Sequence, residues 1–420
     1  MKKIVLSSLV ALTLGTVSAT ASDMKFYTDA NGQLFITPGE GRTLLQANPK
    51  EVMEAMQQAS SQISKKQIKE EIKAELKEEI KKETPVFAKA DKLKFSGTAY
   101  LGYTYTSQED NTLKDESQFE IRRAYLQLKA YLLDDPKSYY RVTLDAHNDG
   151  GSQDMRMKYA YLYLNNVLPS TGVELGLVHR PWHDYEEHNA WYFRNIQKVF
   201  TENTNGAHLS NSADFGFNFK TKTKFIDTEI GLFNGEGYHE DQVDANGISL
   251  EWRATAHILG VNGKDKQTKK TYWDASFFGQ LNENHKASAS GVVGAYDDLH
   301  FYGLHTVYNQ PLFLVSAQYI YSEDTASNAT YVSAQAGDGY SVNGEYRLGS
   351  DLEYRVLARF DSWTPKELNS VNEKEQKTTT LGMAWEQNKN VQWVASVISS
   401  DNQDSTTDTT DYMVTAEVKF

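Results

Sequence analysis

Apolar and polar residues alternate with a period of two over most of the chain, from about residue 93 to its end. In the segment 248–258, for example, Ile248, Leu250 and Trp252 fall on one face, while Glu251 and Arg253 fall on the other. Such alternation predicts β-strands whose two faces meet different surroundings. About sixteen segments of this kind follow one another, each roughly ten residues long, which is the length that a tilted strand needs to cross a bilayer.

The connectors between these segments alternate in length. The short ones are 134–137, 221–224, 309–311, 349–350 and 388–390, and the long polar ones include 107–116, 234–245, 323–337, 363–375 and 401–409. Only 259–270 is long where a short turn is due. Short turns at one end and long loops at the other are typical of outer-membrane barrels. The sequence therefore predicts an all-β fold over 93–420, an antiparallel transmembrane β-barrel of about sixteen strands.

The polar face of the predicted strands carries charge. In the segment 352–361, Glu353, Arg355 and Arg359 lie opposite Tyr354 and Val356. Several charges on one face suit a water-filled lumen better than the packed interior of a secreted β-sandwich or a solenoid. Tyrosine and tryptophan also gather near strand ends, where aromatic girdles are expected at the membrane interfaces. These residues are Tyr103, Tyr105, Tyr139, Tyr140, Tyr321, Trp363 and Trp393.

The last predicted strand alternates up to the final residue, Phe420. Its even positions, from Tyr412 to Phe420, are expected to face lipid, and its odd positions, from Met413 to Lys419, to face the lumen. An open sheet edge in lipid would leave backbone N–H and C=O groups without partners. We therefore expect this strand to close the barrel against the first one, "KFSGTAYLGY".

The first 92 residues follow other patterns. Residues 1–21 combine two lysines, a short apolar run and a small-residue site ending at Ala21, which predicts a secretory signal peptide rather than a membrane anchor. In 22–49, Asn31-Gly32 lies between two β-prone runs and suggests a short hairpin. Residues 50–84 carry an apolar stripe on a highly charged background. We expect a periplasmic helix that pairs as a coiled coil, the alternative being a solitary spacer helix.

Composition narrows the possible functions. The chain has no cysteine, which excludes disulfides and thiolate metal sites and fits an oxidising compartment. Its formal net charge is −13, and removing the two lysines of the signal peptide gives −13 − 2 = −15, which argues against nucleic-acid binding. An exported chain of this kind without another long apolar run is periplasmic, secreted or an outer-membrane barrel.

Two stretches resemble a known family. They are "FEIRRAYLQLKAYLLDDPKSYYRVTLDAH" at 119–147 and "GVELGLVHRPW" at 172–182. Both are similar to the phosphate-selective porin O and P family of Gram-negative outer-membrane porins, whose wider relatives also carry coiled-coil prefixes. The resemblance implies a homotrimeric channel in outer-membrane lipid that passes ions and small hydrophilic solutes. It also implies that Phe420 is an assembly signal for the outer-membrane assembly machinery.

The resemblance further implies a third external loop folded into the lumen, which matches residues 181–211 here. A helical patch is expected near Trp191 and Ile196 of this loop. Loop position places Asp184, Glu186, Glu187, Arg194 and Lys198 beside the lumen, and strand parity adds Arg123, Lys129, Arg141, Arg180, Arg253, Arg347, Arg355 and Arg359. Glu174, Glu251, Glu345, Glu353, Asp145 and Asp361 share that lumen. Mixed charge favours a general diffusion pore, and an anion- or phosphate-preferring channel is the alternative.

Other chemistry receives little support. His179, His183, His188 and Asp184 lie close together in sequence, but loop histidines beside carboxylates are commonly solvated, so we expect no metal. We find no nucleophile elbow, zinc-protease motif or phosphate-binding loop, and we expect neither enzymatic activity nor a cofactor. A structural or adhesive outer-membrane protein, with the helix tethering the cell wall, remains the second alternative.

Overall fold

The computed structural model describes residues 27–28, 34–35, 39–44, 92–109, 113–131, 133–149, 152–239, 247–260, 267–287, 296–324, 336–366, 375–402 and 408–420. The chain forms two compact units, Met1–Ala90 and Asp91–Phe420. In the first unit, β1 (Tyr27–Thr28) pairs antiparallel with both β2 (Leu34–Phe35) and β3 (Thr43–Leu44). The predicted signal peptide and the predicted helix at 50–84 lie outside the described residues. No helix among the described residues is long and apolar enough to cross a membrane.

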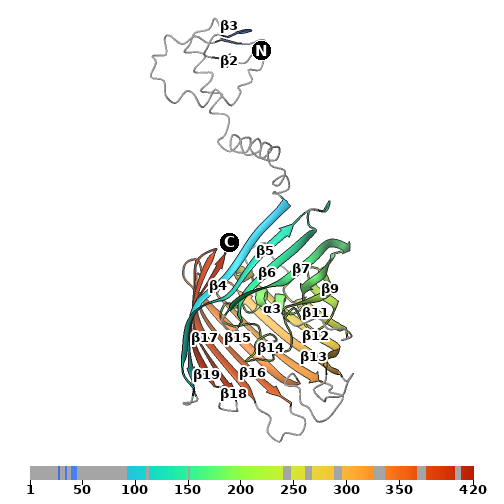
Figure 1. Ribbon diagram of the computed structural model, residues 1–420, viewed down its shortest axis with the longest axis vertical. Helices are drawn as coiled ribbons and strands as arrows, with labels where there is room; N and C mark the ends of the chain where they lie inside the picture. Colours follow the sequence, from blue (N-terminus) through green and yellow to red (C-terminus); the bar gives the residue numbers. More distant parts are fainter. Residues whose placement is uncertain are drawn as a thin grey trace. The chain divides into compact units, whose positions relative to one another are not determined.

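The second unit is a closed antiparallel β-barrel, which confirms the predicted fold class. Its strands in chain order are β4 (Leu93–Gln108), β5 (Glu116–Ala130), β6 (Tyr139–Asp149), β7 (Ser152–Leu168), β8 (Thr171–His179), β9 (Ala213–Lys222), β10 (Ile226–Phe233), β11 (Ser249–His257), β12 (Tyr272–Ala287), β13 (Tyr296–Gln310), β14 (Phe313–Asp324), β15 (Gly337–Leu348), β16 (Tyr354–Pro365), β17 (Gln376–Asn388), β18 (Val391–Asn402) and β19 (Thr409–Lys419). Each strand pairs with its neighbours in sequence (Figure 1).

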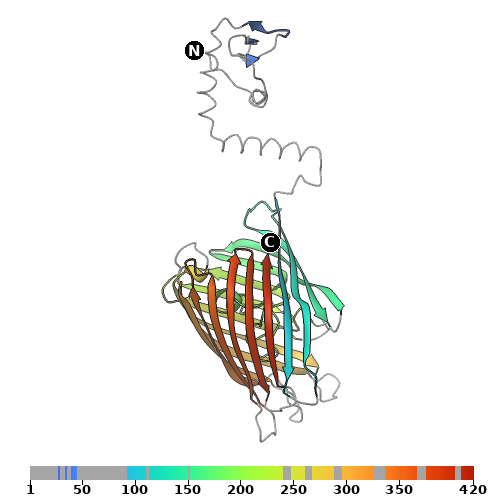
Figure 2. The same ribbon diagram turned by 90° about the vertical axis from the view of Figure 1, so that its left-hand side faces the viewer.

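The barrel closes where the sequence predicts. β19 pairs antiparallel with β4, from Thr409 opposite Gln108 to Lys419 opposite Thr98, and the two strands lie side by side in Figure 2. Two backbone hydrogen bonds extend the ladder: Gly97 N–H donates to the Phe420 carbonyl at 2.9 Å, and Phe420 N–H donates to the Gly97 carbonyl at 3.1 Å. The pairing therefore runs to the last residue of the chain.

The two faces of the wall differ as the alternation predicts. On β11 and β16, Leu250 and Val356 are exposed on the outer face, whereas Glu251, Arg253 and Arg355 are buried on the inner face. The exposed outer face is apolar, as a lipid-facing surface requires. Strand closure also satisfies the backbone groups that lipid could not.

The predicted aromatic girdle needs correction at two positions. Tyr140 is exposed on the outer face, but its neighbour Tyr139 points inward and packs near Tyr161 and Tyr163. Trp363 is also inward and only 1% exposed. Nearness to a strand end does not decide the face of a side chain, because adjacent residues of a strand point to opposite sides.

The two ends of the barrel differ in their connectors. We call the end that carries residues 93 and 420 the terminal end, and the opposite end the loop end. Connectors at the terminal end are short, such as 169–170, 223–225 and 389–390, apart from 258–271, which contains the 3₁₀ turn η3 (Gln267–Lys269). Connectors at the loop end include the long segment between β8 and β9. The predicted exception is found as 258–271, but the asymmetry has a second exception that the sequence did not predict. At the loop end, β6 ends at Asp149 and β7 begins at Ser152, so their connector is short.

Candidate channel constriction

Residues 181–211, between β8 and β9, lie inside the barrel. The segment contains one short helix, α3 (His183–Asn189), which appears within the barrel outline in Figure 1. We expected the helix near Trp191 and Ile196, but it ends before both residues, at Asn189. Asp184 and Glu186 lie in its first turn, where acidic side chains interact favourably with the helix dipole. From Trp191 to Asn211 the chain forms turns and irregular stretches without helix or strand.

Apolar side chains fix this segment against one half of the wall. The Trp182 ring stacks on Phe278 of β12, with ring centroids 3.7 Å apart and planes at 3°. Trp191 and Phe193 pack in a cluster with inward-facing residues of β16–β19. These wall residues are Leu357, Ala384, Val394, Ile398 and Met413. These residues point inward, where alternation along the strands predicts polar side chains facing the lumen. Their apolar character therefore shows which part of the wall the segment packs against.

Hydrogen bonds fix the same segment at further points. Tyr185 Oη donates to Asp274 of β12 at 2.8 Å, and Asn195 Nδ2 donates to Thr415 of β19 at 2.9 Å. Gln197 binds two strands, because its Nε2 donates to Asp361 at 3.3 Å and its Oε1 accepts from Thr380 at 2.7 Å. Contacts to strands this far apart in sequence hold the segment across the lumen, against β12–β19.

A second stretch, 234–239, also folds inward, which the sequence did not predict. The Gly235 carbonyl accepts hydrogen bonds from Arg180 at 3.0 Å and Asn282 at 3.2 Å, and Tyr238 Oη donates to Asp145 at 3.3 Å. Gly235 has φ +108°, a left-handed conformation that favours glycine. Residues 234–239 begin a long polar loop, and their composition gives no sign that they fold inward instead of being exposed at the barrel end.

Two β-bulges add inward cations that strict alternation misses. Across β4 and β5, Tyr100 pairs with Arg123 and Leu101 pairs with Ile121, so Arg122 is an extra residue. Across β6 and β7, Thr143 pairs with Tyr159 and Leu144 with Met157, which leaves Lys158 as an extra residue. Because a bulge shifts the parity of the strand, both members of Arg122–Arg123 and of Lys158–Tyr159 reach the inner side. The tandem arginines and the "RMKY" stretch are the only hints in the sequence.

Most of the predicted lumen arginines lie in ion pairs at the wall. Arg180 bonds Asp214 at 3.3 Å and Glu251 at 2.8 Å, and both partners are buried. The other pairs are Arg123 with Asp145, Arg253 with Glu229, Arg347 with Glu345, Arg355 with Glu345 and Glu386, and Arg359 with Asp361. Within the loop, Arg194 pairs with Glu187 and Glu202, and Lys198 with Glu202. These cations are largely neutralised by their partners.

Three inward cations on the opposite half of the wall are different. Lys129 on β5, Arg141 on β6 and Lys158 on β7 have no carboxylate within ion-pair distance among the described residues, and each lies over a tyrosine ring. The Lys129 ammonium is 4.6 Å from the Tyr139 centroid, and the Arg141 guanidinium is 4.5 Å from that of Tyr159. Such cation–π contacts hold the cation against the ring without neutralising its charge.

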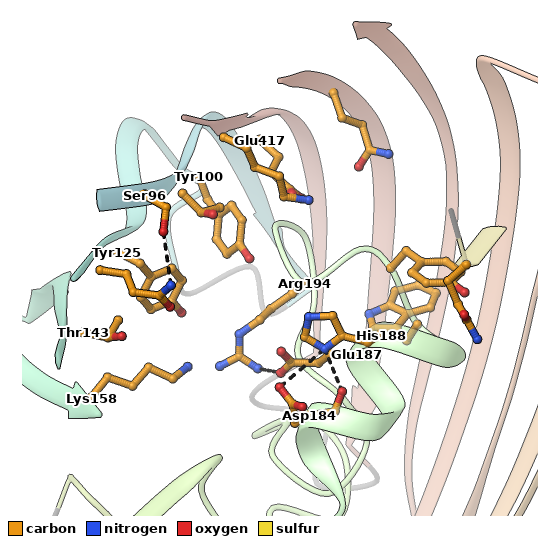
Figure 3. A pocket seen from close by; sticks show the side chains of 18 of the residues that line it. Ser96, Tyr100, Tyr125, Thr143, Lys158, Asp184, Glu187, His188, Arg194 and Glu417 are labelled. Carbon is orange, nitrogen blue, oxygen red and sulfur yellow. Dashed lines mark hydrogen bonds and ion pairs between the residues drawn. The ribbon is translucent and has the colours of Figure 1, made fainter. Parts of the chain in front are cut away.

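Two cavities lie beside the loop, toward the terminal end. One, of about 390 Å³, is lined by Arg141, Asp184, Glu187, Arg194 and Arg355 among the predicted residues (Figure 3). The other, of about 510 Å³, is lined by Lys129, Arg141 and Asp184. Arg123, Arg180, Glu186, Lys198, Arg253, Arg347 and Arg359 line neither cavity. The structure thus brings five of the predicted residues together around one opening and places the others in the wall or behind the loop.

The acidic residues of α3 meet contrasting surroundings. Burial against the wall raises the pKa of the Glu186 carboxyl to about 7, despite nearby Arg359 and a hydrogen bond from Gln318. Burial also opposes ionisation of Asp184, but the neighbouring His188 and His179 hold the pKa of that carboxyl below its usual range. Asp184 is therefore an anion at the cavity edge, while Glu186 is close to its titration point behind the loop at neutral pH.

The histidines of the region are hydrogen-bonded. His179 Nδ1 lies 3.1 Å from Glu174 Oε2, and its Nε2 lies 3.1 Å from Arg141 Nη1. Because Arg141 can only donate, Nε2 accepts and Nδ1 carries the proton. His183 instead points into the loop interior, with Nε2 3.2 Å from the Ser210 carbonyl. His179 Nε2 and His188 Nδ1 both lie near Asp184 Oδ1, at 3.8 and 3.5 Å, but His183 points away from it, so the three histidines do not converge on one point.

No protein-family model matches the sequence, and no curated protein matches it in sequence. Solved structures do match in fold. The anion-selective porin from Comamonas acidovorans matches with a TM-score of 0.56 and 13% identity, over 78% of this chain and 99% of that chain. OprB of Pseudomonas putida matches with a TM-score of 0.59 and 9% identity, over 79% and 95%. The chain has the fold of an outer-membrane porin. A trimer form of OmpT from Vibrio cholerae matches with a TM-score of 0.54 and 13% identity, over 78% and 99%.

Proposed function

We propose that the protein is a passive porin of the outer membrane of a Gram-negative bacterium, not an enzyme. Its barrel would pass ions and small hydrophilic solutes, with the terminal end in the periplasm. The observation that carries the proposal is a barrel with an apolar exterior whose interior is divided by an anchored segment, 181–211, beside polar cavities. A segment held across a water-filled barrel restricts the size of what can pass, and the charges beside it act on ions.

The detailed roles of the residues form part of this proposal. Asp184 and Glu187 on the loop would face Arg141 and Lys158 on the wall, so that a field runs across the opening. The ion-paired arginines of the wall and the buried Glu186 would hold the loop in place. Phe420 would act as the assembly signal, and a homotrimer, as in the solved OmpT trimer form, is the expected assembly. A native mass of one subunit would contradict the trimer.

A preference for anions is the second candidate. It is favoured by the contrast between the two halves of the wall: the arginines near the loop are paired with carboxylates, whereas Lys129, Arg141 and Lys158 lie over tyrosines. Cations without a carboxylate partner among the described residues thus lie on β5–β7, and Lys222 of β9 adds a further one at the rim of the second cavity. The similarity in fold to an anion-selective porin agrees with this candidate.

Planar-bilayer recording tests the proposal. Purified protein is expected to give stepwise conductance increases in KCl, and a reversal potential of the sign for anions in a KCl gradient. Replacing Lys129, Arg141 and Lys158 together by glutamine should move that potential toward zero or reverse it. Protein that inserts without any conductance steps would instead favour a structural or adhesive role.

A further inference from the structure

The cavity of about 390 Å³ combines aromatic surface with unneutralised positive charge. Its wall side carries Tyr100, Tyr125 and Tyr159, and its loop side carries Trp191 and Tyr192. A volume of this size can hold a small organic molecule with a single ring. Aromatic side chains thus contribute to both sides of the opening through which a solute must pass if the proposed function is correct.

The charges around this cavity are not equivalent. Arg194 and Arg355 are held by glutamates, and Lys419 is paired with Glu417. Lys158 and Arg141, in contrast, have no carboxylate partner among the described residues. Lys158 is only 5% exposed, yet its ammonium lies 4.8 Å from the Tyr125 centroid and 5.5 Å from that of Tyr159. Figure 3 shows this side chain extending toward the loop, with Arg194 and Glu187 opposite.

A hydrogen-bond donor completes the arrangement. The Tyr125 hydroxyl is buried, and among the described residues it has no hydrogen-bond partner. A buried polar atom without a partner is costly, so such atoms in native structures call for an explanation. Beside an unpaired lysine, this hydroxyl is suited to donate to an oxyanion that enters the cavity.

We propose that this cavity is a binding subsite for small aromatic carboxylates, an inference that rests on the proposed channel function. The carboxylate would lie between Lys158 and Arg141 and accept from the Tyr125 hydroxyl, while the ring packs against the tyrosines of the wall. Inorganic phosphate is less suited, because a compact, strongly hydrated ion needs more free donors and gains nothing from aromatic surface. An aliphatic carboxylate would use the charge alone.

The expected preference for a ring follows from the contacts available. Aromatic pairs contribute beyond buried area, and that contribution corresponds to a roughly 2- to 10-fold tighter association. The sharpest comparison is benzoate against cyclohexanecarboxylate, which match in charge and nearly in size but differ in aromaticity. Sodium phosphate serves as the third probe. Each is titrated into a single wild-type channel carrying KCl current, and the concentration that halves the current is measured.

Four variants separate the contributions. Tyr125→Leu should abolish the advantage of benzoate over cyclohexanecarboxylate, whereas Tyr125→Phe should preserve that ratio and weaken both carboxylates severalfold. Lys158→Gln should weaken both about equally. Lys377→Gln is the matched control, since Lys377 lies at the loop end and pairs with Glu375. Heat-modifiable mobility on gels confirms that each variant is folded.

The outcomes are distinct. Benzoate acting at a severalfold lower concentration than cyclohexanecarboxylate and phosphate, with the ratio lost in Tyr125→Leu, supports the subsite. Equal action of the two carboxylates, or stronger action of phosphate, overturns it while leaving the channel function intact. Absence of any conductance would overturn the channel function itself.

Discussion

At the scale of single residues, the charged side chains on the inner face of the barrel form two groups. One group is ion-paired and holds the structure together, and the other has no carboxylate partner among the described residues. The two groups are chemically alike, and both include arginines at inward positions of a strand. What differs is the partner. Arg359 lies 2.7 Å from the Asp361 carboxylate and also donates to the Lys198 carbonyl of the loop, so it holds the loop to the wall. Arg141 lies over a tyrosine and borders both cavities.

Glu186 gives a prediction about pH. Burial raises its pKa in the folded protein to about 7, above the ordinary value of a glutamate. A raised folded pKa means that its favourable contribution is fully present below about pH 4.5 and is lost as pH rises through about 7. Glu186→Gln keeps an oxygen that can accept from Gln318 but cannot ionise. Relative to wild type, we expect this variant to gain thermal stability at pH 8 and little or none at pH 5.

The measurement is the difference in Tm between variant and wild type at the two pH values, followed by circular dichroism. The difference between the ordinary glutamate pKa of 4.5 and a folded pKa of about 7 corresponds to roughly 3 kcal/mol of unfolding free energy across the window, which is large enough to detect. Glu323→Gln, at the loop end, is the control and should show no such dependence. A Tm difference that does not change between pH 5 and pH 8 would refute the role of Glu186.

At the scale of elements, the alternation of side chains predicted the strands, their faces and the closing pair, because each depends on a period that a short stretch displays. The extra inward residues Arg122 and Lys158 could not be read in this way. A bulge is defined by two strands together, and the register between them depends on pairing that no single strand reveals. The sequence does carry a sign of the wall surface that the segment 181–211 packs against, since Leu357, Val394 and Met413 are apolar at inward positions.

The inward segment itself gives a prediction. Trp182 is 3% exposed and stacks on Phe278, at the point where the chain leaves the wall. Trp182→Ala should remove this anchor at a cost of about 3–5 kcal/mol, as other buried tryptophans do. We expect the segment to loosen, which should raise the single-channel conductance and increase current fluctuations.

Trp385→Ala is the matched control for this experiment. Trp385 is 41% exposed on the outer face, so its loss should leave the conductance unchanged. Single-channel recording of both variants under the same KCl conditions decides the matter. Unchanged conductance and noise in Trp182→Ala would show that the segment is held without this stack, or that it does not restrict the current.

At the scale of the whole molecule, closing the barrel requires pairing between its first and last strands, which are far apart in the sequence. Sequential hairpins can form from local pairing, but β19 must find β4, roughly three hundred residues away in sequence. Contacts of such long range close late and at high entropic cost. The barrel therefore needs a strong closing contact, and the last residue supplies part of it. The Phe420 ring lies over Gly97, where an added Cβ would come within 2.2 Å of the ring.

Deleting Phe420 should therefore impair assembly more than it changes conductance. The deletion removes both backbone hydrogen bonds to Gly97 as well as the ring, whereas Phe420→Ala removes the ring alone. We expect the fraction of heat-modifiable, membrane-inserted protein to fall severalfold on deletion and less in Phe420→Ala.

Phe95→Ala is a close control, because Phe95 is 69% exposed and Phe420 is 68% exposed on the same outer face near the terminal end. The few assembled channels should conduct as wild type, since Phe420 lines neither cavity. Normal insertion of the truncated chain would show that closure does not depend on its final residue.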